Sequence, residues 1–293
     1  MSYMFNQDSK VGFVGLGVMG SAMAGHILRV HGDVSVYNRS ANKTQAWQAA
    51  HPQATASFDL TELAKSVDVV VLCIGNDDDV RGTVRTMLPH LARGATIIDH
   101  TTTSPALAQE MYALCANVGV AFLDCPVSGG QAGAVNGTLT VMTGGDAAAF
   151  AAAQTVMNMY SKHQRYFGAS GAGQGCKMVN QVLITGILQG LSEGMFLAQN
   201  LGLDANAVVD TLQHGAAGSW QLAQRGVSMS AREFDFGFAI DWMRKDLGIV
   251  SDYVAAHGVD LPLMQSVKQN YERLSQAGFG RNDTSALIRQ FDV

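Results

Sequence analysis

The chain has 293 residues, of which 47% are hydrophobic and 15% are charged, and its formal net charge at pH 7 is −5. This length suggests about two domains, and the hydrophobic content allows a sizeable core, which excludes an intrinsically disordered chain. No long basic run accompanies the negative net charge, so a nucleic-acid partner is not expected.

The four cysteines indicate neither a disulfide framework nor a metal centre. They are Cys73, Cys115, Cys125 and Cys176, and none of them forms a CxxC pair or a metal-ligand spacing. Reduced, partly buried thiols fit a cytoplasmic location. The first residues lack the order of a secretory signal, and the weakly charged stretch Met178–Leu203 carries too many polar side chains for a membrane span. We therefore expect no membrane partner.

The first half of the chain alternates strand-like and helix-like segments. Apolar runs predict strands at residues 11–15, 34–38, 67–74, 96–99, 121–125, 138–143 and 163–167. Helical patterns lie between them, at residues 19–30, 41–50, 79–91, 105–118 and 147–159. Strands that are separated by helices indicate crossover units and a parallel sheet.

Strand signals end after Gly175, and helical segments continue to the end of the chain. The predicted fold is therefore α/β, with an N-terminal Rossmann-type doubly wound sheet followed by an all-α C-terminal domain. The dinucleotide-binding domain is expected at residues 1–170, and the helical substrate and oligomerisation domain at residues 171–293. A long interdomain helix that begins near Gln174 would join them.

A glycine-rich turn follows the first predicted strand. Gly15, Gly17 and Gly20 have the G-x-G-x-x-G spacing, with a strand before them and a helix after them. The first glycine permits a tight turn, the second lets the backbone approach a pyrophosphate, and the third allows close packing of helix on strand. The alternative is a glycine turn in an ordinary α/β domain. The predicted cofactor-binding turn comprises Gly15, Leu16, Gly17, Val18, Met19 and Gly20.

The end of the second strand bears on the choice of cofactor. Domains that prefer NAD place an acidic residue there, whereas this chain has Arg39, with Asn38, Ser40 and Lys43 close by. A guanidinium can pair with a 2′-phosphate, so we expect these residues to bind NADP, with NAD possible. The alternative is a surface arginine on a loop.

A second glycine cluster lies at residues 124–140. Gly129 and Gly130 follow Ser128, and backbone N–H groups in such a turn can form a concave anion site. The serine hydroxyl adds a donor, so a small carboxylate is one expected ligand. A glycine-rich hairpin explains the spacing equally well.

Lys177 lies in the first turns of the predicted interdomain helix, with Asn180 and Gln181 three and four positions later on the same face. Such a lysine can exchange a proton with an alcohol while hydride moves to or from a nicotinamide. The amides can orient substrate oxygens. The alternative is a lysine on a solvated helix face.

Together these motifs resemble the β-hydroxyacid dehydrogenases, the group that includes 3-hydroxyisobutyrate dehydrogenase and tartronate semialdehyde reductase. The resemblance covers essentially the whole chain. It rests on GLGVMG at 15–20, DHTTTSP at 99–105, DCPVSGG at 124–130, GAGQGCKMVNQ at 171–181 and MRKDLGIV at 243–250. It implies an NAD(P)-dependent oxidoreductase acting on a CH–OH group.

The resemblance also implies a role for individual residues. Lys177 would be the catalytic acid/base, and the substrate would be held by Ser128, Gly129, Gly130, Asn180 and Gln181. Thr102 would lie near the nicotinamide, and Lys245 would close the pocket over cofactor and substrate. Ile74 is also expected at the cofactor, although Ile74-Gly75 stands where many members have Leu-Pro.

The implied reaction transfers a hydride between NADP(H) and a short 3-hydroxy carboxylate or its semialdehyde, of the tartronate semialdehyde or 3-hydroxyisobutyrate type. The alternatives are a serine or 4-hydroxybutyrate-type dehydrogenase of the same family and a non-catalytic NADP-binding protein. A homodimer or homotetramer is expected, and Gly186, Gly190 and Gly194 would form a ridge on which a second helix packs closely. Packing within the same chain is the alternative for that ridge.

Overall fold

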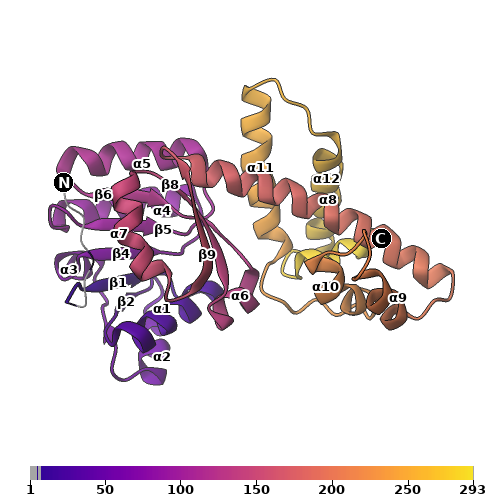
Figure 1. Cartoon of the computed structure of the whole chain (residues 1–293), viewed down its shortest axis with the longest axis horizontal. Coiled ribbons are helices and arrows are strands. Elements are labelled where there is room, and N and C mark those ends of the chain that lie inside the picture. The colour runs from indigo at the N-terminus through magenta and orange to yellow at the C-terminus, as the bar shows by residue number, and fades with distance from the viewer. Residues whose placement is uncertain (1–4, 6–7, 293) are drawn as a thin grey trace. The chain divides into compact units, whose positions relative to one another are not determined.

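The computed structural model describes residue 5 and residues 8–292. The chain divides into two compact units, one ending at Lys177 and one beginning at Met178. Figure 1 shows the elements of each unit, coloured from indigo at the N-terminus to yellow at the C-terminus.

The first unit is built on a mixed sheet that contains nine strands among the described residues, in the order β3-β2-β1-β4-β5-β6-β8-β7, with β9 paired to β8. The strands are β1 Val11–Val14, β2 Ser35–Tyr37, β3 Thr55–Ala56, β4 Val69–Leu72, β5 Thr96–Asp99, β6 Ala121–Asp124, β7 Val127–Ser128, β8 Leu139–Gly144 and β9 Ser161–Gly168. The helices are α1 Val18–His31, α2 Ala41–Ala50, α3 Leu60–Lys65, α4 Asp77–Met87, α5 Pro105–Val118, α6 Gly130–Asn136 and α7 Ala147–Met157, with a short 3-10 helix at Leu88–His90.

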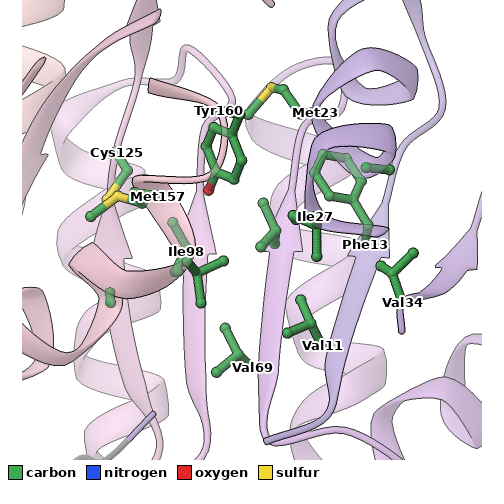
Figure 2. Packing of buried hydrophobic residues seen from close by; sticks show 14 of the residues in the cluster. Val11, Phe13, Met23, Ile27, Val34, Val69, Ile98, Cys125, Met157 and Tyr160 are labelled. Carbon is green, nitrogen blue, oxygen red and sulfur yellow. The ribbon is translucent and has the colours of Figure 1, made fainter. Parts of the chain in front are cut away.

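Both faces of the sheet are covered by apolar side chains. Val69 and Val71 of β4 belong to the cluster that Figure 2 shows around Phe13 and Tyr160, whereas Val70 of the same strand belongs to the cluster on the opposite face. Strands buried on both faces read as continuous apolar runs, which is why their sequences predict them well. The predicted Rossmann-type arrangement is confirmed.

The sheet differs from the prediction at its far edge. The pairs from β3 to β6 are parallel, but β8 runs antiparallel to β6 and β7. The sequence prediction also missed β3, α3, β7 and α6. The missed elements are short, and α6 begins and ends in glycine-rich sequence that has low helix propensity. Positive φ at Gly129 and Gly137 shapes the two ends of that helix.

The second unit is helical. It contains most of α8, Ala172–Asn200, followed by α9 Ala205–Leu212, α10 Trp220–Ser230, α11 Ile240–Ala256, α12 Pro262–Leu274, a π-helical turn Ser275–Phe279 and a 3-10 helix Thr284–Phe291. Its core is a separate cluster that includes Leu188, Met243 and Tyr271. The predicted helical C-terminal part is confirmed, and α8 begins at Ala172, close to the start expected near Gln174.

Among the described residues, α8 is the one helix long and apolar enough to cross a membrane by length and composition. A core helix passes the same test, and 44% of the most apolar window of α8 is buried inside the protein. Gln181, Thr185 and Ser192 are among the buried side chains, and each makes a hydrogen bond within the chain.

A buried histidine, His100, lies next to β5 in the first unit. His100 Nδ1 lies 2.6 Å from the carbonyl oxygen of Cys125, and Nε2 lies 2.8 Å from the hydroxyl of Tyr160. A carbonyl only accepts, so Nδ1–H donates to it and Nε2 accepts from the hydroxyl. Burial lowers the pKa of His100 from 6.5 to about 4, against the opposing effect of the hydrogen bond to Cys125.

We therefore expect the free energy of unfolding to fall as pH falls from 6.5 toward 4, because the unfolded chain then binds a proton that the folded chain excludes. Between pH 7 and pH 5 this loss amounts to about 2 kcal/mol. Urea unfolding of the wild type and of His100→Gln at both pH values tests it. An equal pH dependence in the two proteins would contradict the assignment.

Candidate functional site

The predicted cofactor turn lies between β1 and α1, and packing accounts for two of its three glycines. Gly15 has φ +105°, and a Cβ there would lie 2.2 Å from the carbonyl oxygen of Cys73. A Cβ at Gly20 would lie 1.9 Å from the carbonyl oxygen of Gly15. Any side chain at either position would therefore displace backbone.

Gly17 differs from the other two glycines. A Cβ there would meet no described atom within 4 Å, so contacts within the chain do not require a glycine. Gly17 is also the N-cap of α1, which has no side-chain cap and no acidic residue in its first turn. A helix N-terminus with uncapped N–H groups suits a phosphate, and the missing side chain leaves room for it to approach. The turn thus fits the pyrophosphate of a dinucleotide.

Of the predicted residues at the end of β2, Asn38 contacts this turn directly. Asn38 Oδ1 accepts a hydrogen bond from the backbone N–H of Leu16 at 2.9 Å, so this amide holds the glycine turn in place. Ser40 and Lys43 are exposed at the start of α2. Arg39 is also exposed, and its Nη1 lies 2.7 Å from Oδ1 of Asp79 in α4. An acidic residue therefore reaches Arg39 from a distant part of the sequence.

The segment after β5 adjoins the cofactor turn. The backbone N–H of Ile74 donates to Thr101 Oγ1 at 3.1 Å, and the Ile74 side chain lies against Gly15. Thr101 and Thr103 are buried, whereas Thr102 between them is half-buried.

Gln174 holds this threonine segment from the first turn of α8. Its Nε2 donates to the carbonyl of Thr101 at 2.7 Å, and its Oε1 accepts from the N–H of Thr103 at 3.1 Å. The amide is fully buried. Both of its hydrogen bonds fix the backbone on either side of Thr102.

The structure brings Lys177 and the second glycine cluster together within the first unit. The Nζ of Lys177 donates to the carbonyl oxygen of Val127 at 2.9 Å, and the residue after Val127 is Ser128. Lys177 is 7% exposed, which contradicts the alternative of a solvated lysine. Gly129 and Gly130 have φ values of +126° and +59° and lead from β7 into α6, so a short helix lies in the connection between the antiparallel strands β7 and β8.

Asp124 anchors the start of α8, which carries Lys177. Its carboxylate accepts from the N–H of Gly171 at 2.8 Å and from the N–H of Gln174 at 3.0 Å. Burial raises the pKa of the Asp124 carboxyl, and these N–H groups oppose that rise. Because Asp124 is the last residue of β6, the position of α8's first turn is set by the sheet.

A polar network in the second unit joins the other predicted site residues. Asn180 Nδ2 donates to Gln181 Oε1 at 2.8 Å, and Gln181 Nε2 donates to Asp246 Oδ2 at 2.6 Å. The other oxygen of Asp246 lies 3.1 Å from the Nζ of Lys245. Asp246 is 3% exposed, so one buried carboxylate accepts a hydrogen bond from Gln181 and forms an ion pair with Lys245.

The sequence interpretation assigned no role to four of these side chains, namely Asp79, Asp124, Gln174 and Asp246. Asp124 and Asp246 lie inside motifs that the resemblance quoted, and Asp124 follows the apolar run at residues 121–123, where an acid signals a need for buried partners. Among the described residues, no group of three or more His, Cys, Asp or Glu side chains is arranged to hold a metal ion.

Two family models together match nearly the whole chain. Residues 10–171 match the NAD-binding domain of 6-phosphogluconate dehydrogenase, and residues 171–291 match the NAD-binding domain of NADP-dependent 3-hydroxyisobutyrate dehydrogenase.

Individual relatives cover the chain equally well. An uncharacterised oxidoreductase of Shewanella frigidimarina is 44% identical over 97% of this chain and 98% of its own. The NAD-dependent L-serine dehydrogenase of Pseudomonas aeruginosa is 30% identical, with 97% of this chain and 98% of the relative covered. Among solved structures, Mycobacterium tuberculosis 3-hydroxyisobutyrate dehydrogenase with L-serine has a TM-score of 0.87 at 28% identity, covering 97% and 99%.

Proposed function

Since this chain belongs to the β-hydroxyacid dehydrogenase family and is an NAD(P)-dependent oxidoreductase acting on a CH–OH group, we propose that it interconverts a short 3-hydroxy carboxylate and its semialdehyde with NADP(H). The observation that carries the proposal is the buried Lys177, whose Nζ lies 2.9 Å from the carbonyl oxygen next to Ser128. Tartronate semialdehyde and 3-hydroxyisobutyrate are the proposed substrate types.

In this proposal each residue has one task. The bound nicotinamide supplies or accepts the hydride. Lys177 gives or takes the proton at the hydroxyl oxygen of the substrate. The Ser128 hydroxyl and the N–H groups of Gly129 and Gly130 bind the carboxylate, as donors in a positive-φ turn can. Thr102, on the segment that Gln174 holds, lies near the nicotinamide, and Ile74 contacts the cofactor.

In the second unit, we propose Asn180 and Gln181 as substrate-binding residues and Lys245 as a cofactor-binding residue. The buried Asp246 carboxylate supports this assignment, because it fixes the orientation of Gln181 by a hydrogen bond and forms an ion pair with the Lys245 ammonium. Preorganised donors cost less ordering entropy when substrate binds. We also propose residues 1–170 as the dinucleotide-binding domain and residues 171–293 as the substrate and oligomerisation domain.

The reaction is tested by following the absorbance of the reduced nicotinamide with a panel of substrates. The panel contains 3-hydroxyisobutyrate, glycerate, tartronate semialdehyde, L-serine and 4-hydroxybutyrate. The named relatives favour L-serine as the second candidate substrate. L-serine, like 3-hydroxyisobutyrate, is a carboxylate with a hydroxyl group on its third carbon. Turnover of none of these compounds by a protein that binds NADPH would favour the non-catalytic alternative.

Arg39 is the residue that we expect to set the preference for NADP(H). Arg39→Asp should weaken NADPH binding by about 1.5–3 kcal/mol, because a charge-assisted contact to the 2′-phosphate is lost. NADH binding should weaken far less. Fluorescence titration with both cofactors measures the two changes. A wild type that binds NADH as tightly as NADPH would contradict the NADP preference.

We propose that the protein is a cytoplasmic homodimer or homotetramer. The free cysteines support the compartment. Exposed glycines on α8 support the assembly, since a Cβ at Gly190 or Gly194 would meet nothing within 4 Å in the described part of the chain. Leu197 on the same helix and Leu201 just after its end are exposed, and they add apolar surface for a partner subunit. The mass in light scattering tests the oligomeric state.

A further inference from the structure

The ion pair between Arg39 and Asp79 spans the cofactor turn. Arg39 follows β2, and Asp79 lies in the first turn of α4, which follows β4. These strands are the two neighbours of β1 in the sheet, so their carboxyl ends lie on either side of the glycine turn that follows β1. The Arg39 side chain is 84% exposed and that of Asp79 is 27% exposed, which leaves the guanidinium accessible to a ligand.

Gly75 allows the Asp79 carboxylate to occupy this position. A Cβ at Gly75 would lie 2.1 Å from Oδ2 of Asp79, so any larger residue would push the carboxylate away. Gly75 does not have a positive φ, so the glycine provides space for the carboxylate and is not required by the backbone conformation.

We propose that Asp79 is a cofactor-specificity residue that lowers the preference for NADP(H) over NAD(H). Its carboxylate competes with the adenosine 2′-phosphate for the Arg39 guanidinium and repels the phosphate, because both are anions. The same carboxylate can accept a hydrogen bond from a ribose 2′-hydroxyl, the task of the acid that is missing from the end of β2. The inference rests on the proposed function in one respect, the contact of Arg39 with the 2′-phosphate.

The test compares the dissociation constants of NADPH and NADH, measured by fluorescence titration, in the wild type and in Asp79→Asn. The variant should bind NADPH about two- to fivefold more tightly, the range expected when one exposed ion pair is removed. NADH should bind equally well or less tightly. Gly75→Ala should change the ratio in the same direction, because the new methyl group displaces the Asp79 side chain while the carboxylate remains.

Asp78→Asn is the matched control. It removes the same charge from the same helical turn, but Asp78 is 92% exposed and pairs with Arg81 at 2.8 Å. The ratio of the two dissociation constants should not change in this variant. An increase as large as that of Asp79→Asn would show a general effect of charge and would overturn the proposal.

The variant Arg39→Ala distinguishes a failure of the proposed role of Asp79 from a failure of the proposed NADP preference. If it weakens NADPH binding selectively while Asp79→Asn leaves the ratio unchanged, the role of Asp79 is wrong and the role of Arg39 stands. If Arg39→Ala leaves the ratio unchanged, the proposed NADP preference fails, and the inference about Asp79 fails with it. Each titration uses the full chain, at a temperature well below the measured melting temperature of that variant.

Discussion

Replacement of Lys177 by alanine is expected to lower kcat by about 100-fold or more, the usual contribution of a general acid/base. The dissociation constant of NADPH should change by no more than a few-fold. The physical reason is the position of the Nζ, which contacts Val127 beside Ser128, whereas the cofactor turn is held by contacts with Cys73 and Asn38. Steady-state kinetics and a cofactor titration measure the two quantities separately.

Lys162→Ala is the control for this experiment, because Lys162 is an exposed lysine of β9 in the same unit. It should leave kcat unchanged. Lys177→Arg keeps a positive charge but cannot readily release a proton, so it should be nearly as inactive as the alanine variant. A near-normal kcat in Lys177→Ala would remove the lysine from the mechanism.

The second large effect concerns two glycines of the cofactor turn. We expect substitution of Gly17 to affect NADPH binding and substitution of Gly20 to affect stability. Gly17→Ala is expected to weaken NADPH binding by about tenfold or more and to leave the melting temperature close to that of the wild type. The added methyl group meets no atom of the described chain, but it occupies the space through which a pyrophosphate would approach.

Gly20→Ala is expected to destabilise the fold by about 1–3 kcal/mol, because the added Cβ would lie 1.9 Å from a backbone oxygen and α1 must move away from the turn. Thermal unfolding without cofactor measures this loss. Unfolding curves in which Gly17→Ala is the less stable of the two variants would refute the division of tasks.

The parts of the molecule that follow from local sequence were predictable. Val69 to Leu72 are buried on both faces of the sheet, and a continuous apolar run is what such a strand needs. The turn glycines were also predictable. A side chain at Gly20 would clash with Gly15, only a few residues earlier, and one at Gly15 would clash with Cys73, which follows the adjacent strand β4. The short elements β3 and α3 have too few residues to establish a period.

Contacts between distant residues were not predictable in the same way. Arg39 and Asp79 are 40 positions apart, and the three acids Asp77, Asp78 and Asp79 look alike in the sequence as favourable charges at a helix N-terminus. Gln174 and Thr101 are 73 positions apart, and a glutamine in a helix gives no sign of its partner. The folded structure distinguishes these residues because it fixes which of them share a neighbourhood.

The hydrogen bonds of Asp124 have a consequence for how this protein can evolve by recombination. They attach the first turn of α8 to β6, so Lys177, the proposed proton-transfer group, belongs to the nucleotide-binding unit. The network of Gln181, Asp246 and Lys245 belongs wholly to the other unit. A recombination event that replaced the chain after Lys177 would therefore exchange Gln181, Asp246 and Lys245 together, while the proposed acid/base and the proposed carboxylate-binding turn beside it stayed behind unaltered.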